Sequence, residues 1–280
     1  MLWENSRDGT KRMDPQRWFQ RAIAAGNLLY VLSYRQSQHI PRPLGQPKTI
    51  QQWVHDRIQS SDLSFSERLT GHRLLDFGCG PALCGMITTP ERFTDIVMAD
   101  IAPSNLDTIK RWMDGEEINF NWDQILRLTA ELAGAKSVSE WTERKISHLK
   151  TSVKKLVTCD VTEKLPLGPD YAEAFDVVFT SFCIGCAAKS IAEYKQFLEN
   201  ISSLLKTGGH LLIRGALNAS AYTVDNKMFH HLSLSTSDVK DALCSAQFEV
   251  LEYKSEYFPI AMPHCEATEY GVFVLLARKI

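Results

Sequence analysis

The run LLDFGCGP contains two closely spaced glycines, Gly78 and Gly80, directly after a short apolar stretch. After a buried parallel strand, such a turn lets a ligand approach the backbone closely, because a Cβ atom at either position would obstruct it. This is the usual place for a nucleotide-type cofactor in an α/β sheet. The G-x-G pattern is also compatible with a tight turn that merely packs, so the interpretation needs support from other residues.

Two carboxylates follow the next two apolar runs. Asp100 ends the run IVMAD, twenty residues after Gly80, where an acidic side chain in a doubly wound sheet accepts hydrogen bonds from both ribose hydroxyls of an adenosine ligand. Asp160, followed by Val161, ends a third run, where a carboxylate can receive the adenine amino group. A solvated carboxylate or a helix cap is the alternative for Asp100. Three such features in order favour an adenosine-containing cofactor.

The residues after the second glycine argue against a nicotinamide dinucleotide. That ligand would favour G-x-G-x-x-G, but Leu83 occupies the third glycine position. Pro81 also removes a backbone amide from the start of the helix, where a pyrophosphate would seek one. A cofactor without phosphates fits better, and S-adenosyl-L-methionine is such a ligand.

The elements that must position these residues alternate between buried strands and crossover helices. Such alternation is typical of a parallel α/β sheet. The expected parallel strands begin at Arg73 and continue with 96–100, 155–160, 175–182 and 210–215. The last apolar runs, 248–258 and 271–278, are joined by a loop too short for a crossover helix and predict an antiparallel pair at one edge.

We expect one domain over residues 1–280. Residues 1–70 mix helical stretches with a proline-rich break and predict an N-terminal helical cap or lid over a core of residues 71–280. The segment 111–151 is longer than one crossover helix needs, which predicts a helical insertion beside the site.

Composition limits the classes of partner and compartment. A formal net charge of -2 with both signs scattered gives no basic surface for nucleic acid. Seven cysteines without a repeated C-x-x-C frame favour free thiols and a cytoplasmic location. The N-terminus has no signal-peptide core, and no stretch is long enough for a membrane span. We expect a monomer that binds a small molecule, with no nucleic acid, membrane or metal partner.

The sequence resembles a family of small-molecule N-methyltransferases that includes the nicotinamide, phenylethanolamine and indolethylamine enzymes. The similarity covers nearly the whole chain, and several of the shared motifs are specific to the family. They are LLDFGCGP, AD-x-x-x-x-NL at 99–106, RWM at 111–113, CDVT at 159–162, SLLKTGGHLLI at 203–213, GAL at 215–217 and GVFVLLARK at 271–279. The resemblance implies a Rossmann-like class I methyltransferase fold, with a mostly parallel seven-stranded sheet and an antiparallel C-terminal edge.

The resemblance also implies roles for individual residues toward S-adenosyl-L-methionine and its product S-adenosyl-L-homocysteine. Gly78, Cys79 and Gly80 would line the methionine part and Asp100 the ribose. Asn105 would lie beside the ribose or adenine, and Asp160 with Val161 would hold the adenine. The complete expected cofactor site is Gly78, Cys79, Gly80, Pro81, Asp100, Asn105, Asp160, Val161 and Ser181.

The predicted lid departs from the family pattern. Relatives carry tyrosines after an Asn-Pro or Asp-Pro start, whereas Asp14-Pro15 is followed here by Trp18. Trp18 is a candidate for positioning the cofactor, or an ordinary anchor of the cap helix. It offers no hydroxyl. Tyr30 and Tyr34 are the alternatives for that role.

The acceptor side departs more seriously. Relatives carry acidic residues where this sequence has Gly185 and Gly215, and around Asn218. We expect these three residues and Tyr222, which matches an aromatic residue of relatives, to form the acceptor pocket. A protonated amine in a partly apolar pocket costs several kcal/mol unless a carboxylate pairs with it. The pocket therefore favours a neutral aromatic nitrogen, or an amine held by carboxylates farther away such as Asp225, Glu266 and Glu269.

Methyl transfer from a sulfonium needs alignment more than a protein nucleophile. The main expectation is therefore a small-molecule N-methyltransferase with no certain catalytic residue and with Trp18 and Tyr222 as positioning candidates. The alternatives are a cofactor-binding protein with lost or altered catalysis, and transfer to a non-nitrogen acceptor. A thiol acceptor or redox role for Cys79, Cys183 and Cys186 is a further alternative.

Overall fold

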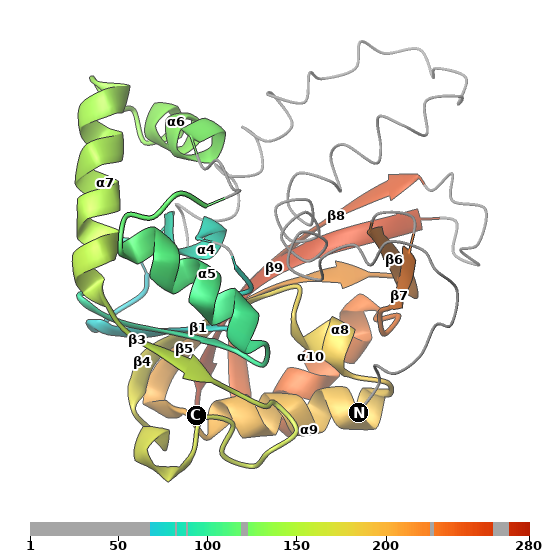
Figure 1. The fold of residues 1–280 in the computed structure, drawn as a ribbon. Helices are drawn as coiled ribbons and strands as arrows, with labels where there is room; N and C mark the ends of the chain where they lie inside the picture. Colours follow the sequence, from blue (N-terminus) through green and yellow to red (C-terminus); the bar gives the residue numbers. More distant parts are fainter. Residues whose placement is uncertain (1–67, 82, 88, 119–122, 225–226, 260–268) are drawn as a thin grey trace, which may run out of the picture.

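The computed structural model describes residues 68–280 apart from 82, 88, 119–122, 225–226 and 260–268 (Figure 1). Its centre is a seven-stranded sheet in the order β3-β2-β1-β4-β5-β9-β8. The strands are β1 (Arg73–Phe77), β2 (Asp95–Asp100), β3 (Val153–Thr158), β4 (Phe175–Ser181), β5 (Leu205–Leu217), β8 (Phe248–Pro259) and β9 (Glu269–Lys279). The mostly parallel seven-stranded sheet expected from the sequence is confirmed.

Five strands are parallel and lie in the middle and at one side of the sheet. β1 pairs with β2 on one side and with β4 on the other, so its carboxyl end lies between the ends of its neighbours. Four of the five residues in β1 are buried, as expected of a strand covered on both faces. This topology gathers the residues that follow β1, β2, β3 and β4 at one edge, the carboxyl edge, where α/β proteins bind their ligands.

The C-terminal strands form the antiparallel edge that the sequence predicted. β9 lies between β5 and β8 and is antiparallel to both. The strand boundaries differ from expectation in β5, which begins five residues earlier than predicted because Leu205 already pairs with Phe175 of β4. β3 begins two residues earlier than predicted, at Val153 directly after a helix.

Helices cover both faces of the sheet. One group is α4 (Cys84–Ile87), α5 (Pro103–Met113), α6 (Asp123–Leu132) and α7 (Val138–Ser152). The other is α8 (Ile184–Ala187), α9 (Ile191–Ser202) and α10 (Thr236–Ser245), with a short 3-10 turn at Pro169–Tyr171. In Figure 1 the two groups lie on opposite sides of the strands. The helices α6 and α7 lie within or next to the segment 111–151.

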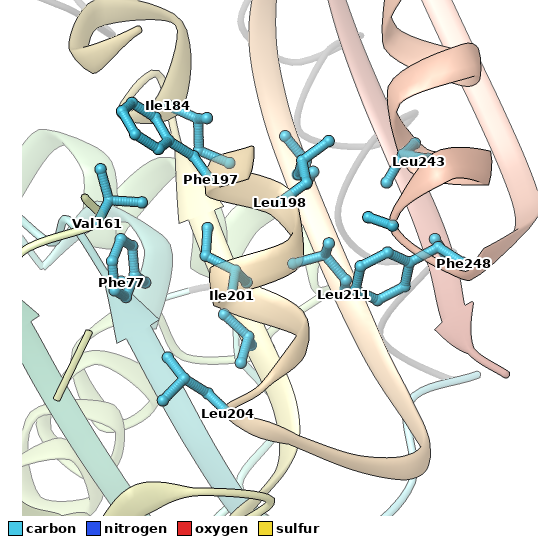
Figure 2. Packing of buried hydrophobic residues seen from close by; sticks show 14 of the residues in the cluster. Phe77, Val161, Ile184, Phe197, Leu198, Ile201, Leu204, Leu211, Leu243 and Phe248 are labelled. Carbon is cyan, nitrogen blue, oxygen red and sulfur yellow. The ribbon is translucent and has the colours of Figure 1, made fainter. Parts of the chain in front are cut away.

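The core consists of two hydrophobic clusters, one on each face. Alternation along β1 places Leu75 in one cluster and Leu74 in the other. Figure 2 shows the first cluster, in which Phe197 and Ile201 of α9 pack over the sheet near Phe77. Burial of this kind contributes about 1.5–3 kcal/mol for each large apolar side chain. The two clusters thus hold the carboxyl edge of the sheet in place.

A short hairpin beside the main sheet was not predicted. β6 (Ala221–Val224) and β7 (Lys227–His230) pair with each other as a separate two-stranded sheet. Their residues mix polar and apolar types without clear alternation, so the strand pattern is weak in the sequence. Among the helices that the structure describes, none is both long and apolar enough to cross a membrane.

Candidate functional site

The turn after β1 requires glycine for two physical reasons. Gly78 and Gly80 have positive φ values of 71° and 60°, a backbone conformation that residues other than glycine adopt only at an energetic cost. A Cβ atom on Gly78 would also lie 2.2 Å from the Sγ atom of Cys183. The amides of Gly78 and Cys79 both donate to the carbonyl of Ala99, at 2.8 and 3.0 Å. These bonds hold the turn against the carboxyl end of β2.

Asp100 connects the turn to the start of the next helix. Its Oδ2 atom accepts from the amide of Gly80 at 2.8 Å. Its Oδ1 atom accepts from the amide of Ala102 at 2.9 Å and from the side-chain nitrogen of Asn105 at 2.8 Å. A carboxylate has about four acceptor positions. The carboxylate is therefore fixed by three bonds and retains capacity for a ligand hydroxyl, and the amide oxygen of Asn105 is a second acceptor beside it.

A second carboxyl group, Asp76, lies beneath the turn and is a site feature to which sequence reasoning assigned no role. Its side chain is 3% exposed. Burial, and after it the charge of Asp100, raises the pKa of the Asp76 carboxyl well above its usual range. The sequence signal was one aspartate within an otherwise apolar strand. The structure thus separates a buried acid with a raised pKa from the carboxylate at the end of β2.

The thiols around this turn are held in their protonated form. Burial raises the pKa values of Cys79 and Cys183 well above the usual range for cysteine, and raises that of Cys186 to about 11. Because the thiolate is the reactive form of cysteine, burial argues against a nucleophilic or redox role for these three residues. Cys79 packs as a small apolar group in the core, whereas the thiol of Cys186 donates to the carbonyl of Phe182 at 3.0 Å.

The loop after β3 lies beside Asp100. The amide of Cys159 donates to the backbone carbonyl of Asp100 at 3.1 Å. Asp160 Oδ1 accepts from the amide and the hydroxyl of Thr162, at 2.9 and 2.7 Å. The carbonyl of Val161 accepts from the side chain of Asn200 at 2.8 Å. The structure therefore brings Asp160 and Val161 to the same edge as Asp100, on a loop fixed by hydrogen bonds.

Two further residues of the expected cofactor site lie in the same region. Pro81 is buried directly after the glycine turn. Ser181 is the last residue of β4, and its Oγ atom is buried without a hydrogen-bond partner in the described part of the chain. A buried hydroxyl of this kind calls for an explanation such as a bound ligand.

A small cavity opens beyond the end of β4, on the acceptor side. It offers about 10 Å³ of space, roughly that of one water molecule. The cavity contains the expected pocket residues Gly185 and Gly215. It is lined by Phe182, Ile184, Gly185, Tyr194, Ile213, Arg214, Gly215, Ala216, His231, Leu234 and Phe273. These described lining residues include no carboxylate.

Arg214 is a charged residue among those that line the cavity. Burial lowers the pKa of its guanidinium to about 10, so the group stays charged at neutral pH. The guanidinium carbon lies 5.3 Å from the ring centroid of Phe179. The ring of Phe179 belongs to the hydrophobic cluster on the opposite face of the sheet from Ile184 and Ile213 of the cavity wall.

His231 is a lining residue that sequence reasoning did not select. Its side chain is buried, and its Nδ1 atom lies 3.1 Å from the carbonyl oxygen of Ala219 and 2.8 Å from that of Leu232. Burial lowers the pKa of His231, although the two carbonyls act in the opposite direction. The imidazole is therefore neutral at neutral pH. A pair of histidines before an apolar segment was its only signal in the sequence.

The remaining predicted residues lie in different surroundings. Asn218 has a positive φ of 57° and its amide donates to the carbonyl of Leu234 at 2.9 Å. Tyr222 on β6 is 40% exposed and stacks on Phe229 with ring centroids 5.3 Å apart. Its hydroxyl also bonds the thiol of Cys186. Neither residue is among those that line the cavity.

Other predictions fall on residues that the structure does not describe. The proposed lid residue Trp18, with Tyr30 and Tyr34, lies outside the described residues. Asp225 and Glu266 also lie outside them, and the side chain of Glu269 is not described. The predicted cap of residues 1–70 therefore stays a prediction.

Comparison with solved structures finds proteins that share the fold of this chain. An S-adenosylmethionine-dependent methyltransferase from Clostridium acetobutylicum is 10% identical, with a TM-score of 0.51, and the match covers 91% of this chain and 99% of that one. The [4+2]-cyclase SpnF is 16% identical, with a TM-score of 0.50 over 95% of both chains. The fold is therefore that of a class I methyltransferase, which is not restricted to methyl transfer.

Sequence comparison identifies closer relatives. The chain is 32% identical to the indolethylamine N-methyltransferase of Oryctolagus cuniculus over 211 residues, 75% of this chain and 78% of the relative. It is 31% identical to the human nicotinamide N-methyltransferase over 212 residues, with the same two coverages. The phenylethanolamine N-methyltransferase of Macaca mulatta is 27% identical, over 76% of this chain and 75% of the relative. The model of the NNMT/PNMT/TEMT family matches residues 50–280, and the chain belongs to this family.

Proposed function

We propose that this chain is an enzyme that transfers the methyl group of S-adenosylmethionine to a nitrogen of a small aromatic or amine metabolite. One observation carries the proposal: in a chain of this family, the Asp100 carboxylate is bonded to the amide of Gly80 in the glycine turn. This bond joins the two parts of a cofactor site. The names of the relatives, all N-methyltransferases, support nitrogen as the acceptor atom.

The residues present fit the cofactor. The glycine turn, which has no side chain at Gly78 or Gly80, would accept the methionine part near Cys79. Asp100 and Asn105 would bind the ribose hydroxyls with their remaining acceptor atoms. Asp160 and Val161 would hold the adenine, and the unpartnered hydroxyl of Ser181 would contact the ligand from the end of β4. No phosphate-binding amide is needed after Pro81.

The bound cofactor supplies a methyl group already activated by a positively charged sulfur. The protein therefore has to align the acceptor nitrogen and exclude water, and such alignment can be worth roughly 7–11 kcal/mol. The buried turn and the apolar walls of the cavity suit this task. A protein nucleophile is not required, which agrees with the protonated state of the nearby cysteines.

The acceptor is proposed to bind as an uncharged molecule. The described residues that line the cavity offer Arg214 and a neutral His231 but no carboxylate. A protonated amine would lose hydration there without gaining an ion pair. A neutral aromatic nitrogen or a weakly basic amine fits these surroundings better.

We also propose a compartment, an oligomeric state and a domain organisation for the enzyme. We place it in the cytoplasm as a monomer, with one domain over residues 1–280, a helical cap at 1–70 and no nucleic-acid or membrane partner. The free cysteines among the described residues and the net charge of -2 support this setting.

A second candidate is a cofactor-binding protein of the same family with lost catalysis, or with a non-nitrogen acceptor. The glycines at 185 and 215, where the family resemblance leads us to expect carboxylates, favour this candidate. Calorimetric titration with S-adenosylmethionine, followed by a methyl-transfer screen over pyridines, anilines, phenylethylamines and tryptamines, separates the two. Binding with N-methylation supports the main proposal, binding without it supports the second candidate, and no binding rejects both.

A further inference from the structure

The segment that carries His231 is fixed to the acceptor cavity by backbone hydrogen bonds. The amide of His231 donates to the carbonyl of Ser220 at 3.0 Å. The next amide, that of Leu232, donates to the carbonyl of Gly185 at 2.8 Å. Gly185 is part of the cavity wall that follows β4, two residues after Cys183. The imidazole is thus held in position before any acceptor binds.

The hydrogen bonds of the ring assign its proton. Both partners of Nδ1 are carbonyl oxygens, which can only accept, so Nδ1 must carry the hydrogen. In the neutral ring, Nε2 then holds a lone pair. The edge formed by Cε1 and Nε2 faces Gly185, because a Cβ atom built there would lie 2.7 Å from each of them. His231 and Gly185 both line the cavity, so the ring edge that carries the Nε2 lone pair lies at the cavity wall.

We infer that His231 is the general base for a methyl acceptor that carries an N–H group, and that its Nε2 atom takes the proton. This inference rests on the proposed function and concerns those of its uncharged acceptors that carry an N–H group. The feature that carries it is a buried imidazole with a fixed tautomer in a cavity whose described lining has no carboxylate.

The chemistry balances without another reactant. The lone pair of the acceptor nitrogen forms the new N–C bond as the C–S bond of the sulfonium breaks, and the electron pair of that bond stays on sulfur. The N–H proton passes to Nε2, and the resulting imidazolium keeps its Nδ1 hydrogen bonds to Ala219 and Leu232. Release of the proton to solvent restores the neutral ring. The products are the N-methylated acceptor, the thioether and one proton.

The charged and titratable groups around the ring allow this role. Arg214 on β5 and Tyr194 on α9 line the same cavity, and His230 is the adjacent titratable residue. The Arg214 guanidinium lies over Phe179, whose ring belongs to the cluster on the other face of the sheet. Burial and the adjacent His230 lower the pKa of the ring, whereas the carbonyls of Ala219 and Leu232 raise it, and the net effect is a lowered pKa. His231 therefore starts the reaction as a neutral base and releases the proton afterwards.

A general base at His231 matters only for acceptors that lose a proton during methylation. An aniline has an N–H proton to lose, whereas a pyridine nitrogen is methylated without losing one. Replacing His231 with Gln keeps a hydrogen-bond acceptor but removes the base. We expect His231→Gln to lower kcat for an aniline roughly 10²–10⁴-fold, with little change in KM, and to lower kcat for a pyridine much less, because no proton is transferred from that acceptor. His230→Gln, at the exposed neighbour whose Nε2 meets the carbonyl of Ala188, should change neither.

Two readouts on the wild type keep the test valid even if the variant folds poorly. With an aniline, kcat should fall at acidic pH as His231 becomes protonated, and this fall should be missing with a pyridine. Nitrogen NMR of the histidines should find His231 as the Nδ1–H tautomer at neutral pH, with an Nε2 signal that shifts when aniline binds. An Nε2–H tautomer, or an imidazolium at neutral pH, would overturn the inference.

The outcomes separate this inference from the proposed function. Methylation of pyridines but not anilines by the wild type, or an aniline rate that His231→Gln leaves unchanged, rejects the role of His231 while the proposed function stands. Failure of the wild type to methylate any nitrogen, despite binding S-adenosylmethionine, rejects both. Loss of aniline methylation alone in His231→Gln, together with the Nδ1–H tautomer, supports the inference.

Discussion

The imidazole ring of His231 occupies the space that a side chain at position 185 would need: a Cβ atom on Gly185 would lie 2.7 Å from both Cε1 and Nε2 of the ring. The resemblance to the family leads us to expect an acidic side chain at position 185. In this chain the imidazole, which comes from a segment 46 positions later, occupies that space. The missing carboxylate and the buried histidine are therefore one structural feature.

Substitution of Gly185 should act through His231. Gly185→Ala forces the ring to move, and we expect a loss of about 1–3 kcal/mol of unfolding free energy from the overpacking. In a His231→Ala background the same substitution has room and should cost less than about 0.5 kcal/mol. Chemical denaturation of the four proteins measures the coupling. Equal costs in both backgrounds would show that the two side chains do not compete.

Asp100 should control cofactor affinity. Asp100→Ala removes a carboxylate that bonds Gly80 and that we assign to the ribose. We expect calorimetry with S-adenosylhomocysteine to find binding weaker by at least about 1.5 kcal/mol, or roughly tenfold, as for hydrogen bonds to charged groups. Asp107→Ala, at an exposed position of α5, is the matched control and should bind normally. Unchanged affinity in a folded Asp100→Ala protein would remove this residue from the site.

A side chain at Gly78 should destabilise the protein more than a side chain at Gly134, another glycine with a left-handed backbone conformation. Gly78 and Gly134 have nearly the same φ, 71° and 67°, but a Cβ atom meets Cys183 at 2.2 Å in the first case and nothing within 4 Å in the second. Gly134→Ala should therefore cost only the conformational penalty of about 1–2 kcal/mol. Gly78→Ala should cost about 1–3 kcal/mol more. Thermal unfolding measures both, and similar losses would contradict the role of the close contact.

The buried Asp76 should make stability depend on pH. Its folded pKa lies above the unfolded value of about 3.9, so the folded state binds more protons and stability falls as pH rises above that value. Asp76→Asn keeps the shape without the charge and removes this fall. We expect the variant to gain stability relative to wild type between acidic and neutral pH, as followed by denaturation over a pH series. A constant difference between the two proteins would mean that Asp76 titrates normally.

Local patterns were enough to predict the main sheet and the order of the cofactor residues. Runs such as LLDF and IVMAD are buried strands, and topology places their ends together, as the bond between Gly80 and Asp100 illustrates. The full length of β5 was not predictable, because its first residues are polar and are set by pairing with β4. The hairpin β6–β7 was not predictable either, because its strands of four residues each mix polar and apolar types and pair only with each other.

The acceptor side was less predictable than the cofactor side. The meeting of His231 with Gly185 depends on hydrogen bonds between segments far apart in the chain, such as that from Leu232 to Gly185. No spacing rule reports such a contact from one sequence. The raised pKa of Asp76 depends in the same way on its burial by neighbours in the fold.

The proposed transfer of a methyl group to nitrogen is tested most directly by mass spectrometry of the products. The assay uses methyl-labelled S-adenosylmethionine and a panel of neutral nitrogen acceptors. We predict that one acceptor class gains the labelled methyl group on nitrogen, and that one S-adenosylhomocysteine is formed for each methylated product. Cofactor binding with no labelled nitrogen product from any acceptor would contradict it.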